Sequence, residues 1–207
     1  MPTTPNSEGG NGRLPEGDGH AGYALPCGRK LRLDLHSHCH EATYTTHSTL
    51  EAARAIVAAA RRRALDGLAI TDHIERKWAF EVRRIVAEEY GDTFLIIPGQ
   101  EAMRGYHHIV ELYLAPDCVF RFMAHPTPGS GWDQQLAGLH GLEVANPHWL
   151  LDTAKIAAVA QQRGLLLLTN SDAHSLEAIG QYSNELDPQE LLVRARQLTT
   201  AGRGSQP

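Results

Sequence analysis

Histidines and carboxylates recur along this chain at the points where stretches of apolar residues end. Imidazole and carboxylate groups are the ligands that Zn, Mn and Fe ions take in proteins. In a His-x-His or Asp-x-His pair, alternate side chains of an extended segment share one face, so both can reach one ion. The sequence therefore predicts a metal centre if the fold brings these segments together. The candidate segments are His36-Ser-His38, Asp72-His73, Glu101, His125 and Asp172-Ala-His174.

Glu101 is the carboxylate that we expect to bridge two ions, because each of its two oxygens can bind one. Two ions about 3.5–4 Å apart activate a water molecule and stabilise both the attacking and the leaving oxygen of a phosphoryl group. The leading prediction is an enzyme that hydrolyses a small phosphorylated substrate. Two alternatives stay open: hydrolysis of another bond, such as an amide, and a non-catalytic domain that holds metal or binds a partner. Arg104, Arg76 and Lys77 could supply a further cation for phosphate or could simply be solvated.

The residues between these segments predict alternating strands and helices. Over 31–38 apolar and polar residues alternate, which predicts a strand with leucines on one face and Asp34, His36 and His38 on the inner face. A helix is predicted over 48–66, because it opens with a Ser-x-x-Glu capping box. Further strands are predicted over 68–71, 94–97, 108–114, 119–124, 142–144 and 165–168, and further helices over 77–90, 149–163 and 188–198.

This alternation predicts a parallel sheet with helical crossovers, either a barrel or an open doubly wound sheet. In α/β barrels the active site lies at the C-terminal ends of the strands, where the candidate ligands fall. His140 and His148 lie outside the pattern, and we expect them at the surface or in the core. Glu143 ends a strand, and a site-facing role and a structural role are equally expected for it. The three tryptophans are more typical of packing than of substrate stacking.

The chain has 207 residues, of which 42% are apolar, as expected for one globular core. Residues 1–29 are rich in Gly, Pro, Asn and Ser. They predict a disordered tail, because they cannot bury enough apolar surface to offset the entropy of ordering. The folded domain is expected over 30–200, followed by a flexible tail over 201–207.

Charge and cysteine content exclude several classes of partner. The net charge is −5, and the densest basic run, Arg61-Arg62-Arg63, is expected at a helix end, so long nucleic acid is not expected to bind. No apolar run approaches the roughly 20 residues that span a bilayer, and the N-terminus lacks a signal-peptide pattern. The three cysteines form no Cys-x-x-Cys pair, which fits a reducing compartment. We therefore expect a soluble, cytoplasmic protein of unknown oligomeric state.

The ordered set of motifs resembles the polymerase and histidinol phosphatase (PHP) superfamily, and in particular its smaller phosphoesterase branch. The resemblance covers about residues 31–180. It implies a distorted (β/α)7 barrel in a single domain, with two to three divalent ions of Zn, Mn or Fe. The motifs that carry it are Asp34-Leu-His36-Ser-His38, Ile70-Thr-Asp-His73, Pro98-Gly-Gln-Glu101, Ala124-His125-Pro126 and Ser171-Asp-Ala-His174.

The resemblance also implies a ligand set and catalytic residues. Asp72 would orient a ligand or a water molecule, and with Glu101 and Asp172 it is a candidate catalytic residue. The position after the second histidine where the family usually carries an Asp or His is Tyr44 here; His47 is the preferred substitute and His40 is an alternative. The implied ligands are His36, His38, Glu101 and Asp172 for the first ion, Glu101, His108 and His125 for the second, and His73 and His174, completed by His47, for the third.

Overall fold

The computed structural model describes residues 25–44, 47–73 and 76–203, with side chains described to residue 197. Most of the predicted N-terminal tail, and residues 204–207 of the C-terminal one, lie outside the described residues. The described chain begins at Leu25, which is 6% exposed and packs into the interior cluster. Gly28 N donates to Asp187 Oδ2 at 3.1 Å. This segment is therefore held against the barrel before the first strand begins.

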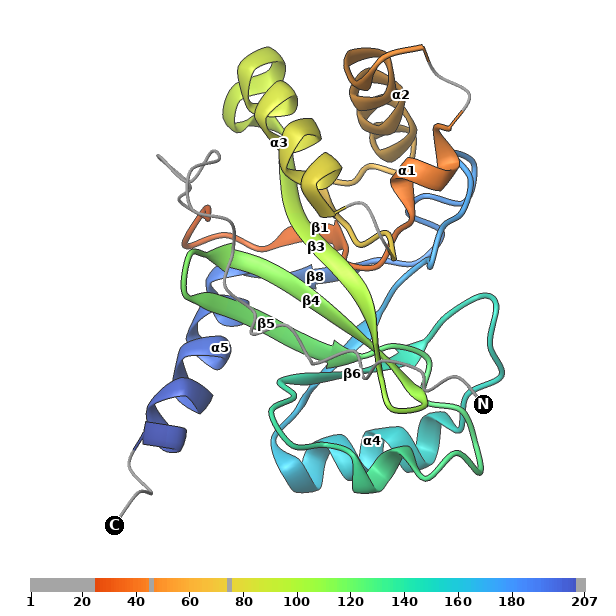
Figure 1. Ribbon diagram of the computed structural model, residues 1–207, viewed down its shortest axis with the longest axis vertical. Helices are drawn as coiled ribbons and strands as arrows, with labels where there is room; N and C mark the ends of the chain where they lie inside the picture. Colours follow the sequence, from red (N-terminus) through yellow and green to blue (C-terminus); the bar gives the residue numbers. More distant parts are fainter. Residues whose placement is uncertain (1–24, 45–46, 74–75, 204–207) are drawn as a thin grey trace, which may run out of the picture.

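One eight-stranded sheet, in the order β7-β6-β5-β4-β3-β2-β1-β8, curves into a nearly closed barrel (Figure 1). The barrel closes where the segment after β7 meets the segment after β1: Ser37 bridges Ala173, and Asp172 N donates to His36 O at 2.9 Å. Two of the candidate metal-ligand motifs are thus the segments that complete the ring. The strands are β1 (Leu31–Asp34), β2 (Gly67–Ile70), β3 (Leu95–Arg104), β4 (His107–Ala115), β5 (Cys118–Met123), β6 (Gly141–Ala145), β7 (Leu166–Thr169) and β8 (Asn184–Leu186).

The predicted single α/β barrel is confirmed, but the strand–helix alternation is interrupted in its middle. β3, β4 and β5 pair as an antiparallel meander with no helix between them. Because β4 runs against its neighbours, its first residues lie at the same end of the barrel as the last residues of β3 and β5. This direction brings His108, near the start of β4, to the edge where the other candidate ligands lie.

α2, α3 and α4 cover the outside of the sheet, whereas α5 packs Leu191 and Ala195 into the interior cluster. The serine half of the predicted capping box is confirmed, since Glu51 N donates to Ser48 Oγ at 3.3 Å, whereas the Glu51 carboxylate accepts from His47 N one residue earlier. α4 begins later than the sequence predicted, because Asp152 accepts from Lys155 N and caps the helix there, which leaves Trp149 in a loop. The helices are α1 (Cys39–Ala42), α2 (Thr49–Arg62), α3 (Arg76–Tyr90), α4 (Thr153–Arg163) and α5 (Pro188–Arg203), with 3-10 turns η1 (Gly91–Thr93) and η2 (Trp132–Gln134).

The barrel interior is apolar, which corrects one prediction for the first strand. Leu31 and Leu33 lie in the interior cluster with residues of β3, β4 and β5, whereas the polar side chains were predicted on the inner face. The reason is that β1 ends at Asp34, so the alternation does not continue to His38. Asp34 turns to Ser171, whose backbone N–H and hydroxyl both donate to it. His36 and His38 then follow at the mouth of the barrel.

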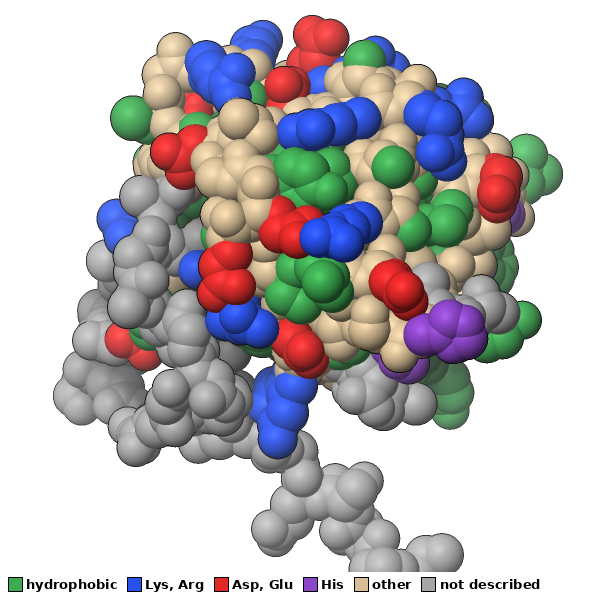
Figure 2. All heavy atoms as spheres, turned by 90° about the horizontal axis from the view of Figure 1, so that it is seen from above, with side chains coloured by type: hydrophobic (Ala, Val, Ile, Leu, Met, Phe, Trp, Pro, Cys, Tyr) green, Lys and Arg blue, Asp and Glu red, His purple; other side chains and the backbone are tan. Residues whose placement is uncertain are grey.

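The outward face of α2 and α3 carries charges of both signs (Figure 2). Arg54 and Glu89 form an ion pair between these helices at 2.6 Å, and the Arg61 guanidinium lies 5.0 Å from the ring centroid of Tyr90. The predicted basic run is therefore partly engaged within this face. None of the described helices is long and apolar enough to cross a membrane.

Candidate metal centre

Four residues predicted for one ion form a buried group at the mouth of the barrel. His36 and His38 follow β1, Glu101 lies in β3, and Asp172 follows β7. All four are 5% exposed or less. His38 Nε2 lies 3.0 Å from Asp172 Oδ1 and 3.2 Å from Glu101 Oε2, and His36 Nε2 lies 3.3 Å and 3.4 Å from the same two oxygens. The structure therefore brings together the complete set that the resemblance implied for the first ion.

Opposite charges hold this buried group together. Burial lowers the pKa of His38, but hydrogen bonds to Asp172 and Glu101 outweigh burial and raise its pKa to about 9. Burial likewise opposes a charge on His36, whereas the carboxylates beside it raise its pKa well above the ordinary value. Burial raises the pKa of Glu101, and hydrogen bonds with the surrounding imidazoles lower it far more. The carboxylates thus require positive charge at this point, which either protons or metal ions can supply.

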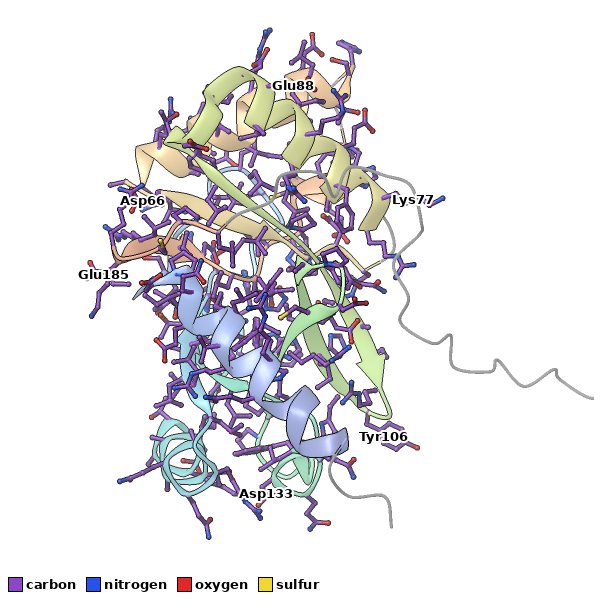
Figure 3. All side chains as sticks on the ribbon, turned by 90° about the vertical axis from the view of Figure 1, so that its left-hand side faces the viewer. Asp66, Lys77, Glu88, Tyr106, Asp133 and Glu185 are labelled. Carbon is purple, nitrogen blue, oxygen red and sulfur yellow. The ribbon has the colours of Figure 1, made fainter. Side chains whose placement is uncertain are left out.

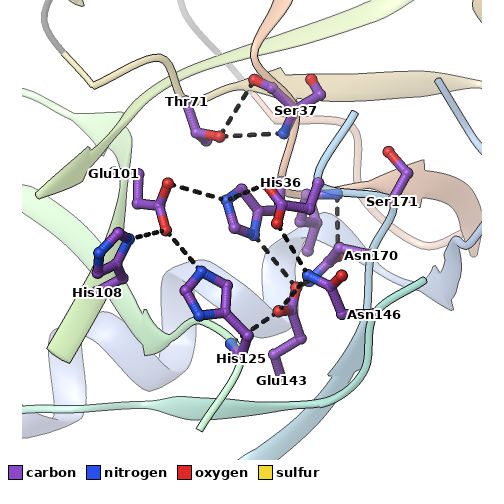
Figure 4. Close-up of polar contacts among 12 residues, drawn as sticks. His36, Ser37, Thr71, Glu101, His108, His125, Glu143, Asn146, Asn170 and Ser171 are labelled. Carbon is purple, nitrogen blue, oxygen red and sulfur yellow. Dashed lines mark hydrogen bonds and ion pairs between the residues drawn. The ribbon is translucent and has the colours of Figure 1, made fainter. Parts of the chain in front are cut away.

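Glu101 presents its other oxygen to two further histidines. Oε1 lies 2.7 Å from His108 Nδ1 and 3.1 Å from His125 Nε2 (Figure 4). The carboxylate therefore lies between two sets of imidazoles, as a bridging ligand would. The backbone before it is packed too closely for any side chain, because a Cβ at Gly99 would lie 2.8 Å from Glu111 O. This close approach fixes the position of β3 between its neighbouring strands, and so fixes how far Glu101 lies along the barrel axis.

A third group of donors lies at the exposed rim of the barrel. It contains His38, His73 and His174, as predicted in part, together with Glu41, which sequence reasoning missed. His174 Nε2 lies 3.7 Å from Glu41 Oε2, and the rings of His38 and His174 stack at 4.1 Å. The sequence signal for Glu41 was only its nearness to the His-x-His motif. We call Glu41, His73 and His174 the rim group.

His47, the residue expected to complete this third site, lies elsewhere. Its backbone N–H donates to Glu51 Oε2 at 3.1 Å as part of the α2 cap. Its side chain lines a separate cavity of about 280 Å³ with His40, Tyr44 and Trp78. None of His40, Tyr44 and His47 belongs to a donor group among the described residues. Among the described residues, the carboxylate that lies in this third donor group is Glu41.

Asp72 positions the segment that carries Glu41. Its Oδ1 accepts from His40 N at 3.0 Å and from Glu41 N at 3.3 Å, which satisfies free N–H groups at the start of α1. Burial raises the pKa of Asp72, although these backbone hydrogen bonds oppose the rise. Its other oxygen, Oδ2, is buried and has no hydrogen-bond partner. This arrangement fits the predicted orienting role of Asp72 toward a neighbouring ligand or water.

Glu143 lies behind the buried group and is itself fully buried. One oxygen lies 3.3 Å from His36 Nδ1 and accepts from Asn170 Nδ2 at 2.9 Å; the other accepts from His125 N at 2.8 Å and from Asn146 Nδ2 at 3.1 Å (Figure 4). A carboxylate that binds one ring nitrogen of a histidine fixes the tautomer that turns the other nitrogen toward a metal. Of the two roles left open by the sequence, this geometry favours the one at the site.

Two site residues have backbone angles that side chains rarely adopt. His125 has φ 30° and Asp172 has φ 50°. Such strain costs about 1–3 kcal/mol per residue and persists only where the surroundings hold the backbone in place. Here the backbone N–H of His125 is bound by Glu143, and that of Asp172 by His36 O at 2.9 Å. The strained backbone of these two residues turns their side chains toward Glu101 and His38 in the donor groups.

Other residues considered in the sequence lie outside the donor groups. His140 is 5% exposed, and its Nδ1 accepts from Arg121 N at 2.8 Å, so of the two expected positions, surface and core, it takes the core. Arg104 donates to Ala137 O at 3.4 Å, and Lys77 projects away from the barrel (Figure 3). Arg76 lies beside the Tyr113 hydroxyl. A phosphate-binding role for these three cations stays a prediction.

The donor groups fit divalent metal ions. In each group the candidate ligand atoms all lie within 4.8 Å of one another. Two ring nitrogens in the buried group, His36 Nε2 and His38 Nδ1, are buried and make no hydrogen bond, although His36 Nε2 lies 3.3 Å and 3.4 Å from two carboxylate oxygens. A buried polar atom without a partner costs free energy. Nitrogen and oxygen donors gathered in this way suit Zn, Mn or Fe, and a cation would satisfy both the charge and such unpaired nitrogens.

Comparisons with known proteins agree with this geometry. A family model described as PHP-associated matches residues 152–198. A solved structure from Bifidobacterium adolescentis, named for a proposed metal-dependent phosphoesterase, is 15% identical, with a TM-score of 0.59 over 79% of this chain and 96% of that one. PsfC from Pseudomonas syringae is 16% identical, with a TM-score of 0.51 over 85% of this chain and 97% of that one. No curated protein sequence gives a significant match.

The match to the PHP-associated family model covers only the C-terminal part of the chain. The matched segment begins at the cap of α4 and includes β7, Asp172, His174 and most of α5. In the barrel it contributes β7, β8 and one candidate metal donor each to the buried group and the rim group, Asp172 and His174. At identities of 15% and 16% the two solved structures show the fold, so the roles of the site residues rest on their geometry.

Proposed function

We propose that this chain is a member of the PHP superfamily and a metal-dependent phosphoesterase that hydrolyses a small phosphate ester. The observation that carries the proposal is the sharing of residues between donor groups. Glu101 belongs both to the buried group and to the group with His73 and His108, while His38 and His73 link these to the rim. Ions held by such groups would lie side by side, which is the arrangement that stabilises the attacking and leaving oxygens of a phosphoryl group.

Divalent ions bound in these groups would polarise the ester and lower the pKa of a water molecule. The chain's own part is to hold the donors in place. Glu101 separates two sets of imidazoles, and Asp172 is held between His38 and the Asn146 amide, which donates to Oδ2 at 3.2 Å. With both oxygens engaged, the Asp172 carboxylate has little freedom to rotate, so its lone pairs are aimed in advance of substrate binding.

Glu41 weakens the case for a non-catalytic domain. That alternative drew support from Tyr44, a poor ligand at a position where the family usually has a good one. Glu41 supplies a carboxylate to the same rim group, at 3.7 Å from His174. Hydrolysis of another bond, such as an amide, remains the alternative that the experiment must separate, because the same donor groups serve it equally well.

The proposal is tested by loading the purified protein with Zn, Mn or Fe and assaying phosphomonoesters, phosphodiesters and amides together. We expect at least two ions per chain by elemental analysis and release of inorganic phosphate or an alcohol from a phosphate ester. His140→Gln serves as the matched control, since His140 is a buried histidine outside the donor groups. Bound metal with amide hydrolysis alone, or with no turnover of any ester, would overturn the proposal.

A further inference from the structure

The loop after β6 is tied to the metal centre at its start. Asn146, 7% exposed, donates from Nδ2 to Glu143 at 3.1 Å and to Asp172 at 3.2 Å. Its Oδ1 accepts from His148 N at 2.8 Å, and the His148 ring lies edge-on to His174 at 6.3 Å. The loop therefore passes over the mouth of the barrel from a fixed starting point before α4 begins.

Trp149 in this loop lies flat on a candidate ligand. Its ring stacks on His125 with centroids 4.6 Å apart and planes 15° from parallel. The residue is nevertheless 45% exposed. Because one face of the indole covers His125, the exposure belongs to the opposite face and the edges. His125 Nε2 lies 3.1 Å from Glu101, so an open aromatic surface lies one ring away from the bridging carboxylate.

Core packing does not account for this position. Trp132, by contrast, is 1% exposed and packs into the cluster beneath α4, where its large apolar surface is removed from water. Trp149 leaves much of that surface in water at the edge of the candidate active site. The exposed surface of such an indole is removed from water when another planar group stacks on it, and this burial stabilises the complex.

We propose that Trp149 is a specificity-determining residue that receives the planar part of the alcohol released from the phosphate ester, either an aryl ring or the base of a nucleoside. The leaving group stacks on the open face of the indole while the phosphate lies at the donor groups. The inference rests on the proposed phosphoesterase function and names its substrate class. Stacking recognises the π-face, so it favours aromatic esters as a class without selecting one base.

Trp149 could instead only support His125, and the two roles make different predictions. A support role would change metal content and the turnover of all substrates in the same proportion. A stacking role changes the ratio between aromatic and aliphatic substrates and leaves metal content unchanged. Trp149→Ala and Trp149→Phe separate them, with Leu150→Ala as a control, because Leu150 is a 91% exposed apolar neighbour in the same loop.

The test measures kcat/KM for phenyl phosphate and glycerol phosphate on the metal-loaded variants. For Trp149→Ala we expect about a tenfold loss for phenyl phosphate and a change below about twofold for glycerol phosphate, with an intermediate loss for Trp149→Phe. Leu150→Ala should match the parent. Equal losses for both substrates, or a loss of bound metal, would overturn the stacking role.

Binding measured without turnover keeps this test separate from the test of the proposed function. Phenylphosphonate and methylphosphonate carry a P–C bond that ester hydrolysis does not cleave. In the metal-loaded parent we expect phenylphosphonate to bind about tenfold more tightly than methylphosphonate, and Trp149→Ala should abolish the difference. If this preference is absent from the parent, or survives in Trp149→Ala, the inference fails even if esters are hydrolysed. If the preference behaves as expected but no ester is hydrolysed, only the proposed function fails.

Discussion

The buried group and the rim group use the same kinds of side chain in different surroundings. In the buried group, histidine and carboxylate atoms lie 3.0–3.4 Å apart with almost no exposure. In the rim group the corresponding distance is 3.7 Å, and the side chains of His174 and Glu41 are 47% and 48% exposed. Strands and a buried carboxylate hold the first, whereas a short helix and loops hold the second. We therefore expect the buried group to bind a metal ion more tightly than the rim group, where water and salt screen the charges.

The largest effect is expected from Glu101→Gln, because Glu101 belongs to two donor groups. The substitution keeps the volume but removes the charge and one anionic oxygen between two cations. We expect loss of metal from the second site and a fall in turnover of about 10³-fold or more, similar to the loss of a main electrostatic group in other active sites. Elemental analysis and ester assays measure both, while circular dichroism should show a retained fold. Full metal content and rate would refute the bridging assignment.

The next effect is expected from Glu143→Gln, which tests whether the buried group is preorganised from behind. Three partners of Glu143 are donors, and His36 Nδ1 is a fourth when His36 binds metal through Nε2. In Glu143→Gln, the amide NH2 group would therefore face donors whichever side it occupied. We expect metal affinity to fall by about 10–100-fold, as for other residues that orient metal-bound histidines.

Metal titration measures the fall in metal affinity expected for Glu143→Gln. Glu111→Gln is the control, because Glu111 is also a strand glutamate but pairs with Arg121 instead, at 2.7 Å. If Glu143→Gln kept the affinity of the parent, the buried group would not depend on this support.

Glu41→Gln should have a smaller effect, confined to the rim. We expect loss of one ion equivalent at limiting metal and a decrease in turnover of about tenfold, because charges at the exposed mouth are screened by water and salt. His47→Gln should leave both unchanged, since the His47 backbone serves the α2 cap and its side chain lies in another cavity. The reverse outcome, with His47 required and Glu41 dispensable, would restore His47 as the ligand.

The smallest effect on the site is expected from His140→Gln, which should leave metal content and turnover almost unchanged. Its effect appears in stability. Burial lowers the pKa of His140 to about 4, so the unfolded chain binds a proton more readily than the folded chain. The stability that this neutral histidine contributes is present above about pH 6.5 and is lost as the pH falls toward 4, by about 3 kcal/mol at most. Chemical denaturation between these pH values should show a weaker pH dependence for His140→Gln than for the parent; an identical slope would contradict this assignment.

The chemistry of the site and the order of the elements were predictable from sequence because both follow local rules. The helix cap at Ser48 and the buried four-residue set are both found where the sequence indicated. The alternation of strands and helices left a barrel and an open doubly wound sheet as alternatives, and the family resemblance implied the barrel, which places strand ends at one edge. His108, by contrast, was assigned from the resemblance alone, and the reversed direction of β4 explains why it reaches that edge.

Only the tertiary structure decided which carboxylate completes the rim, whether Glu143 faces the site, and where Trp149 lies. The direction of Glu41 is set by α1, a helix of only four residues. The backbone N–H groups of His40 and Glu41 in this helix donate to Asp72, which is 32 and 31 residues away in the sequence. The spacing of residues near the His-x-His motif carries no information about such a partner. The direction of a short helix or loop is set by the long-range hydrogen bonds that hold its ends, and these form only when the barrel closes.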